Sequence, residues 1–170
     1  MGHPVAVLMG SDSDWEVMKA CAEQLKEFGV GCHVEVMSAH RSPLRVCAFA
    51  SSASELGFKV LIAGAGMSAA LAGTLAAHTT LPVIGVPLAS GALGGLDALL
   101  CTVQMPPGTP VAGMAVGAAG ARNAALLAVQ ILALSDPGLA SALQNFKSKL
   151  AEAVDSRNRV LQERLQGGRS

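Results

Sequence analysis

The chain has 170 residues, the size of one domain with a substantial buried core. Twelve basic and twelve acidic residues give a formal net charge of zero without any block of like charge, which argues against nucleic acid or an anionic membrane as a partner. Only 14% of the residues are charged and 51% are apolar, so we expect part of the surface to be buried against other copies of the chain.

Short apolar runs alternate with longer segments of helical periodicity along most of the chain. In chain order the pattern predicts a strand at Val5–Met9, a helix at Trp15–Phe28, a strand at Cys32–Met37, a helix at Pro43–Leu56, a strand at Val60–Ala63, a helix ending near His78, strands at Val83–Val86 and Val111–Val116, and helices at Asn123–Leu134 and Leu139–Leu165.

This alternation is typical of a parallel sheet that helices cover on both faces. The predicted class is α/β, with a flavodoxin-like, doubly wound, five-stranded parallel sheet and an extra C-terminal helix. We expect a single domain over residues 1–166, with the helix 139–165 in contacts between subunits, and a disordered tail at 167–170. Ligands bind such a sheet at the carboxyl ends of its strands, which draws attention to the loops at 10–14, 38–43, 64–73 and 87–95.

The N-terminal segment, the longest apolar stretch and the cysteines indicate the cellular compartment. The N-terminal segment MGHPVAVLMG has no basic flank and no signal-peptide core, and glycines and polar residues interrupt the apolar stretch 111–134, so it does not predict a membrane span. We therefore expect a cytoplasmic protein. The cysteines are widely separated and form no CxxC pair, so we expect buried, reduced thiols rather than disulfides or metal ligands: Cys21, Cys32, Cys47 and Cys101.

The first loop, Gly10-Ser11-Asp12-Ser13-Asp14, follows a strand and opens a helix. Backbone amides at a helix N-terminus, together with serine hydroxyls, suit a phosphate group. Ser13 or Asp12 alone could serve as an N-cap, but four polar residues in succession exceed what capping requires, so we favour an anion site. The dinucleotide fingerprint GxGxxG is absent here.

The second loop, SAHRSP at 38–43, places His40 beside Arg41. A guanidinium binds phosphate or carboxylate, and an imidazole transfers protons near neutral pH. The alternative is a surface histidine with a solvated arginine, and the ligand-facing position of the loop favours function. The third loop, GAGMSAALAG at 64–73, has three glycines and no charged side chain. Close approach of a ligand and tight packing of helix on sheet explain it equally well. We interpret His33 and His78 as structural.

Six segments together carry a resemblance to a known family: MGSDSDW at 9–15, SAHRSP at 38–43, AGAG at 63–66, LPVIGVPL at 81–88, VQMPPGTPV at 103–111 and AGARNAALLA at 119–128. They resemble the 5-(carboxyamino)imidazole ribonucleotide mutase family, also called the catalytic subunit of phosphoribosylaminoimidazole carboxylase. The match is collinear from about residue 4 to 135.

The resemblance implies a purine biosynthesis enzyme that needs no metal or other cofactor. Such an enzyme converts 5-(carboxyamino)imidazole ribonucleotide to 4-carboxy-5-aminoimidazole ribonucleotide by moving a carboxyl group from nitrogen to a ring carbon. The implied route releases carbon dioxide in a closed pocket and recaptures it. The resemblance also implies a homo-octamer whose active sites lie between subunits.

Position by position, the resemblance implies that His40 is the catalytic acid and base. Ser11, Asp14 and Arg41 match substrate-binding residues of the family. From the same three loops we expect the remaining contacts to the aminoimidazole ribonucleotide: Ser13, Ser38, Ala39, Gly66, Met67, Ser68 and Leu71. The segments 90–95 and 104–106 are expected to help close the pocket.

The third loop departs from the common mutase pattern GAGGAAHLPG, because Ala70 stands where a second active-site histidine is expected. The family's other branch carboxylates aminoimidazole ribonucleotide directly with carbon dioxide and has loops similar to AGRSNALSG. The chain agrees with that branch at Ser68, Ala70 and Leu71. Arg41, Pro43 and the segments at 81–88 and 103–111 follow the mutases, so we favour the mutase and keep direct carboxylation as the alternative.

A receiver-like or nucleotide-binding regulatory domain is the non-enzymatic alternative, since it shares this sheet. A receiver needs an aspartate at the end of the third strand, where the chain has Ala63 and Gly64. A flavodoxin-type electron carrier needs aromatic residues around its flavin, and the chain has no tyrosine and one tryptophan.

Overall fold

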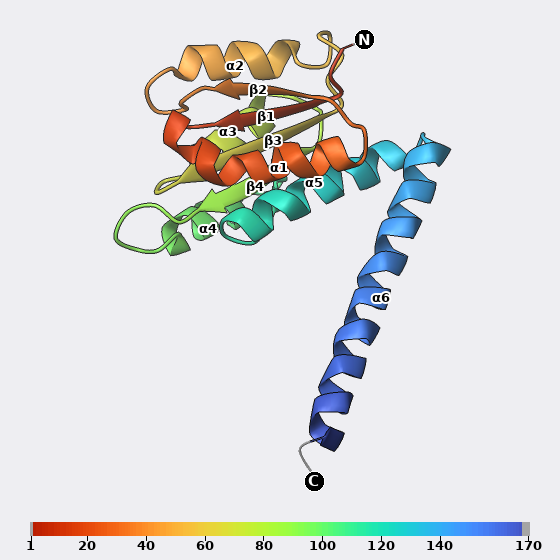
Figure 1. The fold of residues 1–170 in the computed structure, drawn as a ribbon. Helices are drawn as coiled ribbons and strands as arrows, with labels where there is room; N and C mark the ends of the chain where they lie inside the picture. Colours follow the sequence, from red (N-terminus) through yellow and green to blue (C-terminus); the bar gives the residue numbers. More distant parts are fainter. Residues whose placement is uncertain (1, 168–170) are drawn as a thin grey trace. The chain divides into compact units, whose positions relative to one another are not determined.

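The computed structural model describes residues 2–167. They form two compact units, one up to Ile131 and one from Leu132, which are described separately. In the first unit the strands form one parallel five-stranded sheet in the order β2-β1-β3-β4-β5, which confirms the predicted fold (Figure 1). Its strands are β1 (Val5–Met9), β2 (Cys32–Val36), β3 (Val60–Gly66), β4 (Val83–Leu88) and β5 (Ala112–Gly113).

Helices connect each strand to the next, and one follows the last strand. They are the 3-10 turn η1 (Asp12–Asp14) and the helices α1 (Trp15–Glu27), α2 (Pro43–Ser52), α3 (Ala70–His78), α4 (Leu96–Val103) and α5 (Ala118–Ala133). Helix α5, which follows the last strand, extends two residues past the end of this unit. Every residue of β1 and β4 is buried, as their continuous apolar sequences predict for strands covered on both faces.

The two faces of the sheet follow from the alternation of side chains along each strand. Ala6 and Leu8 of β1 belong to a core cluster that includes Val46 of α2 and Leu75 of α3. The intervening residues of β1 point to the other face. On that face lies α1, which buries Met18, Cys21 and Leu25 (Figure 1).

The register of the strands brings their carboxyl ends to one edge. Met9 pairs with Val36 of β2 and with Gly64 of β3, so the loops that follow these strands start close together. Gly66 at the end of β3 pairs with Leu88 at the end of β4, which adds the fourth loop. The predicted edge for ligand binding is therefore formed by residues that lie far apart in the sequence.

Several element boundaries differ from the sequence-based expectation. Helix α2 ends at Ser52 rather than Leu56, and the chain then turns to Gly57, which has a φ of +91°. Strand β5 is limited to residues 112–113, and α5 begins at Ala118 rather than Asn123. Helix α4 is absent from the predicted elements, although Leu96, Leu99, Leu100 and Val103 recur at helical spacing, because eight residues are shorter than the stretch over which periodicity is usually read.

The cysteines are all free thiols, but only Cys21 is buried. The expectation of burial is therefore wrong for Cys101, which is exposed, and only partly met at Cys32 and Cys47, which are half-buried. Cys101 is exposed because α4 buries only Ala98 and Thr102.

The second unit consists mainly of α6 (Pro137–Gly167), a helix without buried residues. It begins two residues earlier than predicted, and Gly167, predicted to open a disordered tail, is its last residue; residues 168–170 lie outside the described part of the chain. Within residues 2–167, no helix combines the length and the apolar character that crossing a membrane requires.

Candidate active site

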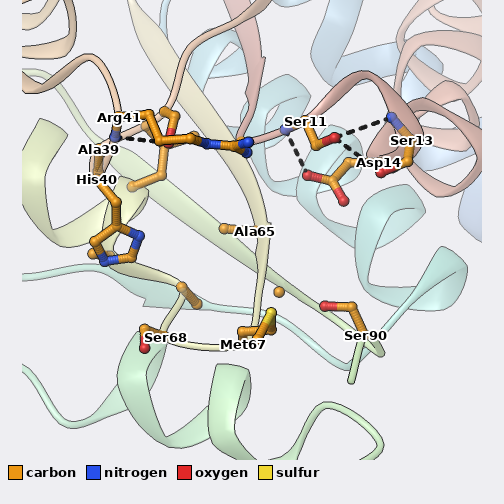
Figure 2. A pocket seen from close by; sticks show the side chains of 16 residues that line it. Ser11, Ser13, Asp14, Ala39, His40, Arg41, Ala65, Met67, Ser68 and Ser90 are labelled. Atoms are coloured by element: carbon orange, nitrogen blue, oxygen red, sulfur yellow. Dashed lines mark hydrogen bonds between the residues drawn. The ribbon is translucent and has the colours of Figure 1, made fainter. Parts of the chain in front are cut away.

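All the residues that the sequence predicts for the site line one cavity of about 340 Å³ at the carboxyl edge of the sheet (Figure 2). The first loop contributes Ser11, Ser13 and Asp14, and the second contributes Ser38, Ala39, His40 and Arg41. The third contributes Gly66, Met67, Ser68 and Leu71. The lining also includes Ser90 and four residues outside the predicted set: Gly10, Ala65, Ala69 and Ala70.

The first loop is held by a capping box. The hydroxyl of Ser11 accepts a hydrogen bond from the backbone N–H of Ser13 at 3.4 Å, and Asp14 Oδ2 accepts one from the N–H of Ser11 at 3.0 Å. The cap is thus Ser11, rather than Ser13 or Asp12. Capping and cavity lining are both observed, so the two interpretations of this loop are compatible.

Asp14 is the carboxylate of the cavity, and its ionisation is perturbed. Burial raises the pKa of Asp14 above 3.8, and the negative charge of Asp12 adds to this effect. Hydrogen bonds from the backbone of Ser11 and Gly10 oppose the rise without cancelling it. The carboxyl group therefore holds its proton to a higher pH than an exposed aspartate does.

The second loop is a turn that serine side chains stabilise from within. Ser42 Oγ accepts a hydrogen bond from the N–H of Ser38 at 3.1 Å and donates one to the Ser38 carbonyl at 3.0 Å. The N–H of Arg41 donates to Ser38 Oγ at 3.2 Å. This network fixes the backbone on both sides of His40 while leaving its side chain exposed.

The two basic side chains of this loop are available to a ligand. Figure 2 shows the guanidinium of Arg41 pointing toward Ser11 across the cavity, while the ring of His40 lies on the side of Ser68. Among the described residues, neither side chain has a hydrogen bond or ion pair with the protein. The cavity therefore offers a cation beside two serine hydroxyls at one end and an imidazole at the other.

The third loop is strained where it borders the cavity. Met67 and Ala69 have φ angles of +54° and +23°, in a region that residues with a Cβ rarely adopt. Met67 is 61% exposed, so its strain is not offset by burial of its own side chain. Non-glycine residues in such conformations cluster at functional sites, which is consistent with the position of this loop.

The glycines of the third loop serve different purposes. A Cβ on Gly64 would lie 2.5 Å from Met18 Sδ, which is packing of helix against sheet. A Cβ on Gly66 would lie 1.7 Å from Ser90 Oγ, at the cavity wall. Both explanations of the glycine-rich loop therefore hold, each at its own position.

Of the two segments expected to help close the pocket, 90–95 and 104–106, only the first contributes to the cavity lining. Ser90, from the loop after β4, lines the cavity as expected. Residues 104–106 do not line it; Met105 instead lies 3.3 Å from the position of a Cβ on Gly73. The backbone-lining residues Gly10 and Ala65 carry no chemical signal in the sequence, and only their positions at strand ends could have indicated them.

His33 is structural, as predicted. Its Nε2 lies 2.8 Å from Glu35 Oε2, and its ring stacks on Phe49 with centroids 6.1 Å apart. Within residues 2–167 no group of three or more His, Cys, Asp or Glu side chains could hold a metal ion.

Known proteins are similar to this chain over nearly its whole length. A family model described as AIR carboxylase matches residues 4–153. The N5-carboxyaminoimidazole ribonucleotide mutase of Brucella melitensis is 51% identical over 157 residues, which cover 92% of this chain and 97% of that protein. The enzyme of the same name from Mycobacterium tuberculosis is 50% identical and covers 96% of this chain and 92% of its own length.

Solved structures give the same result. A crystal structure of Treponema denticola PurE superposes with a TM-score of 0.81 at 29% identity and covers 89% of this chain and 94% of that one. A structure of Treponema denticola PurE2-S38D has a TM-score of 0.82, also at 29% identity, with 92% and 96% covered.

Proposed function

The chain belongs to the AIR carboxylase family, and on that premise we infer that it is a purine biosynthesis enzyme, an N5-carboxyaminoimidazole ribonucleotide mutase. It is an isomerase that converts 5-(carboxyamino)imidazole ribonucleotide to 4-carboxy-5-aminoimidazole ribonucleotide. The observation that carries this conclusion is the 51% identity to a mutase over 97% of that enzyme's length.

The phosphate of the ribonucleotide binds at the end of the cavity where Arg41 points toward Ser11 (Figure 2). A guanidinium with two hydroxyls and the backbone amides of η1 supplies a cation and several hydrogen-bond donors for phosphate oxygens. Asp14 carries a partly buried carboxyl that accepts donors from the ribose or the amine of the substrate. The third loop, at Gly66 to Ser68, borders the imidazole.

His40 moves the proton in both halves of the reaction. It first donates a proton to the exocyclic nitrogen as the N–C bond to the carboxyl group breaks and carbon dioxide forms. The ring carbon then attacks carbon dioxide, and His40 removes the proton from that carbon, which restores the aromatic ring and the protonated imidazole. The same side chain therefore gives up and recovers one proton in each turnover. The imidazole has no hydrogen bond or ion pair with the described part of the protein, which leaves it available for this role.

Retention of carbon dioxide between the two halves depends on the walls of the cavity. The third loop and Ser90 of the fourth loop line the same cavity as His40. Holding the gas next to the ring carbon makes its recapture an intramolecular step, which is favoured over capture from solution.

We propose further that the enzyme is cytoplasmic and acts without a cofactor as a homo-octamer, with α6 in contacts between subunits. Helix α6 has no buried residue and exposes the apolar side chains of Leu150, Val154, Leu161 and Leu165. An exposed apolar series at helical spacing is typical of a surface that another chain covers.

A second candidate reaction is the direct carboxylation of aminoimidazole ribonucleotide with carbon dioxide, a lyase-type activity. The third loop favours it, because Ala70 replaces the expected histidine and Ser68 and Leu71 agree with that branch. Both reactions would take place in the same cavity and give the same product.

An isotope experiment tests the mutase proposal. The carboxyl group of 5-(carboxyamino)imidazole ribonucleotide is labelled with heavy carbon, unlabelled bicarbonate is added, and the product is analysed by mass spectrometry. We expect the label to be retained in the wild-type product. His40→Asn should form no product while it still binds the ribonucleotide in calorimetry. Complete loss of the label during turnover would contradict transfer within the pocket, and normal turnover by His40→Asn would remove His40 from the proton transfer.

A further inference from the structure

A second pair of chemically reactive groups lies outside the cavity. Cys47 on α2 and His78 at the end of α3 face each other with 3.2 Å between Sγ and Nε2. Neither residue lines the candidate active site. The pair bridges two helices that pack on the same face of the sheet, so the packing that holds α2 against α3 also holds the imidazole against the thiol.

Cys47 differs from the other thiols of the chain. Burial raises the pKa of the Cys21 thiol to about 12, and burial also raises the pKa of Cys32, so both are held as thiols. Cys101 is exposed, but no basic group lies at hydrogen-bond distance from it within the described residues. Cys47 is half-buried and has the exposed His78 as its partner. Among the described residues it alone combines solvent access with an adjacent base.

The surface beside the pair has room for a small molecule. A hollow of about 470 Å³ is lined by His78 together with Ser51, Ser54, Ala77, Thr79 and Thr80. Ser51 lies one helical turn after Cys47, so the thiol is next to this hollow. Four hydroxyl-bearing residues and no carboxylate line it, which suits a polar reagent and does not repel an anionic one.

We propose that Cys47 is a modification site: a nucleophilic thiol that His78 activates and that takes up small-molecule disulfides. His78 Nε2 accepts the proton of the thiol, and the Cys47 sulfur attacks one sulfur of the disulfide. The S–S bond of the reagent breaks, a mixed disulfide forms on Cys47, and the leaving thiolate takes the proton back from the imidazolium. Cys47 is oxidised, one half of the reagent is reduced to a thiol, and atoms and electrons balance.

The site lies close to the catalytic loop along the chain. Helix α2 begins at Pro43, two residues after Arg41, and Cys47 is one turn into it. The proposal does not depend on which reaction the enzyme catalyses, because the thiol reaction is measured without the ribonucleotide.

The test compares the folded full-length wild type with C47A, C101S and H78N. Each protein reacts with the uncharged reagent 4,4′-dithiodipyridine at neutral pH, release of the pyridine thione is followed by absorbance, and the modified cysteine is located by peptide mass mapping. We expect the fastest phase to map to Cys47, to disappear in C47A and to persist in C101S. H78N should slow it by about tenfold or more, since the imidazole accepts the thiol proton.

Circular dichroism confirms that each variant is folded, and the thiol rate of Cys101 serves as an internal control in H78N. The proposal is overturned if the fastest phase maps to Cys101, or if H78N modifies Cys47 at the wild-type rate. A slower Cys47 reaction in H78N with an unchanged Cys101 rate supports it, because a general loosening of the fold would raise both rates.

Discussion

Replacing Gly66 by alanine tests the contact that closes the cavity between the third and fourth loops. The new Cβ would lie 1.7 Å from Ser90 Oγ, 2.9 Å from Ser90 Cβ and 3.3 Å from the Leu88 carbonyl oxygen. Rotation of the Ser90 side chain moves its hydroxyl away but leaves Ser90 Cβ in place. Gly66 does not have a positive φ, so the alanine meets a steric obstacle rather than backbone strain.

The magnitude follows from overpacking, which typically costs about 1–3 kcal/mol. Ser90→Ala should recover only part of this loss, because the contact at 2.9 Å remains. Ser90→Gly removes both close contacts and should recover most of it. By itself, Ser90→Gly should destabilise the protein by about 0.4–1 kcal/mol through the added freedom of the unfolded chain. The same substitution therefore changes sign between the two backgrounds.

Urea unfolding of the four proteins in this cycle measures the coupling, and turnover is assayed in parallel. We expect G66A to have a lower midpoint and reduced turnover, and G66A/S90G to be more stable than G66A. If G66A is as stable and active as the wild type, or if S90G lowers stability equally in both backgrounds, the assigned contact between these loops is wrong.

Three further predictions concern the loops around the cavity. Met67→Gly should raise the free energy of unfolding by about 0.5–1 kcal/mol, because relief of about 1–2 kcal/mol of left-handed strain exceeds the entropic cost of glycine; a lower urea midpoint would contradict this. Arg41→Ala should raise KM about 10- to 100-fold through loss of charged hydrogen bonds to phosphate, while Arg45→Ala, which alters a neighbouring arginine paired with Glu35, should not; equal effects would argue against a phosphate site. The raised pKa of Asp14 favours folding below pH 3.8, where the carboxyl group is protonated in both the folded and the unfolded protein, and this contribution is lost as the pH rises through the folded-state pKa. Asp14→Asn should therefore gain stability relative to wild type from acid pH to neutrality. A stability difference that does not vary with pH would refute burial as the cause of the raised pKa.

The sequence predicted the convergence of the site because that convergence follows from topology. Apolar strands alternating with helices imply a parallel sheet, and the carboxyl ends of its strands share an edge. Ser11, His40 and Ser68, in three separate loops, could therefore be assigned to one cavity before any contact was known.

Contacts between residues distant in sequence were not predictable in the same way. The approach of Ser90 to Gly66 depends on the register of β3 and β4, and no local pattern encodes it. Cys47 and His78 are 31 positions apart, and their distance depends on how two helices pack. Helix α4 was missed for a different reason: Leu96, Leu99, Leu100 and Val103 recur at helical spacing, but over only eight residues, which is too short a stretch for periodicity to distinguish a helix.

The most direct measurement of the central claim compares two reactions of the same purified enzyme. One assay supplies 5-(carboxyamino)imidazole ribonucleotide, and the other supplies aminoimidazole ribonucleotide with dissolved carbon dioxide; the ring-carboxylated product is followed by its ultraviolet absorbance in both. We predict that the enzyme turns over the first substrate faster, even though Ala70 stands in place of the second histidine. Efficient turnover of the second substrate alone would contradict the mutase assignment and would show that the third loop determines the reaction.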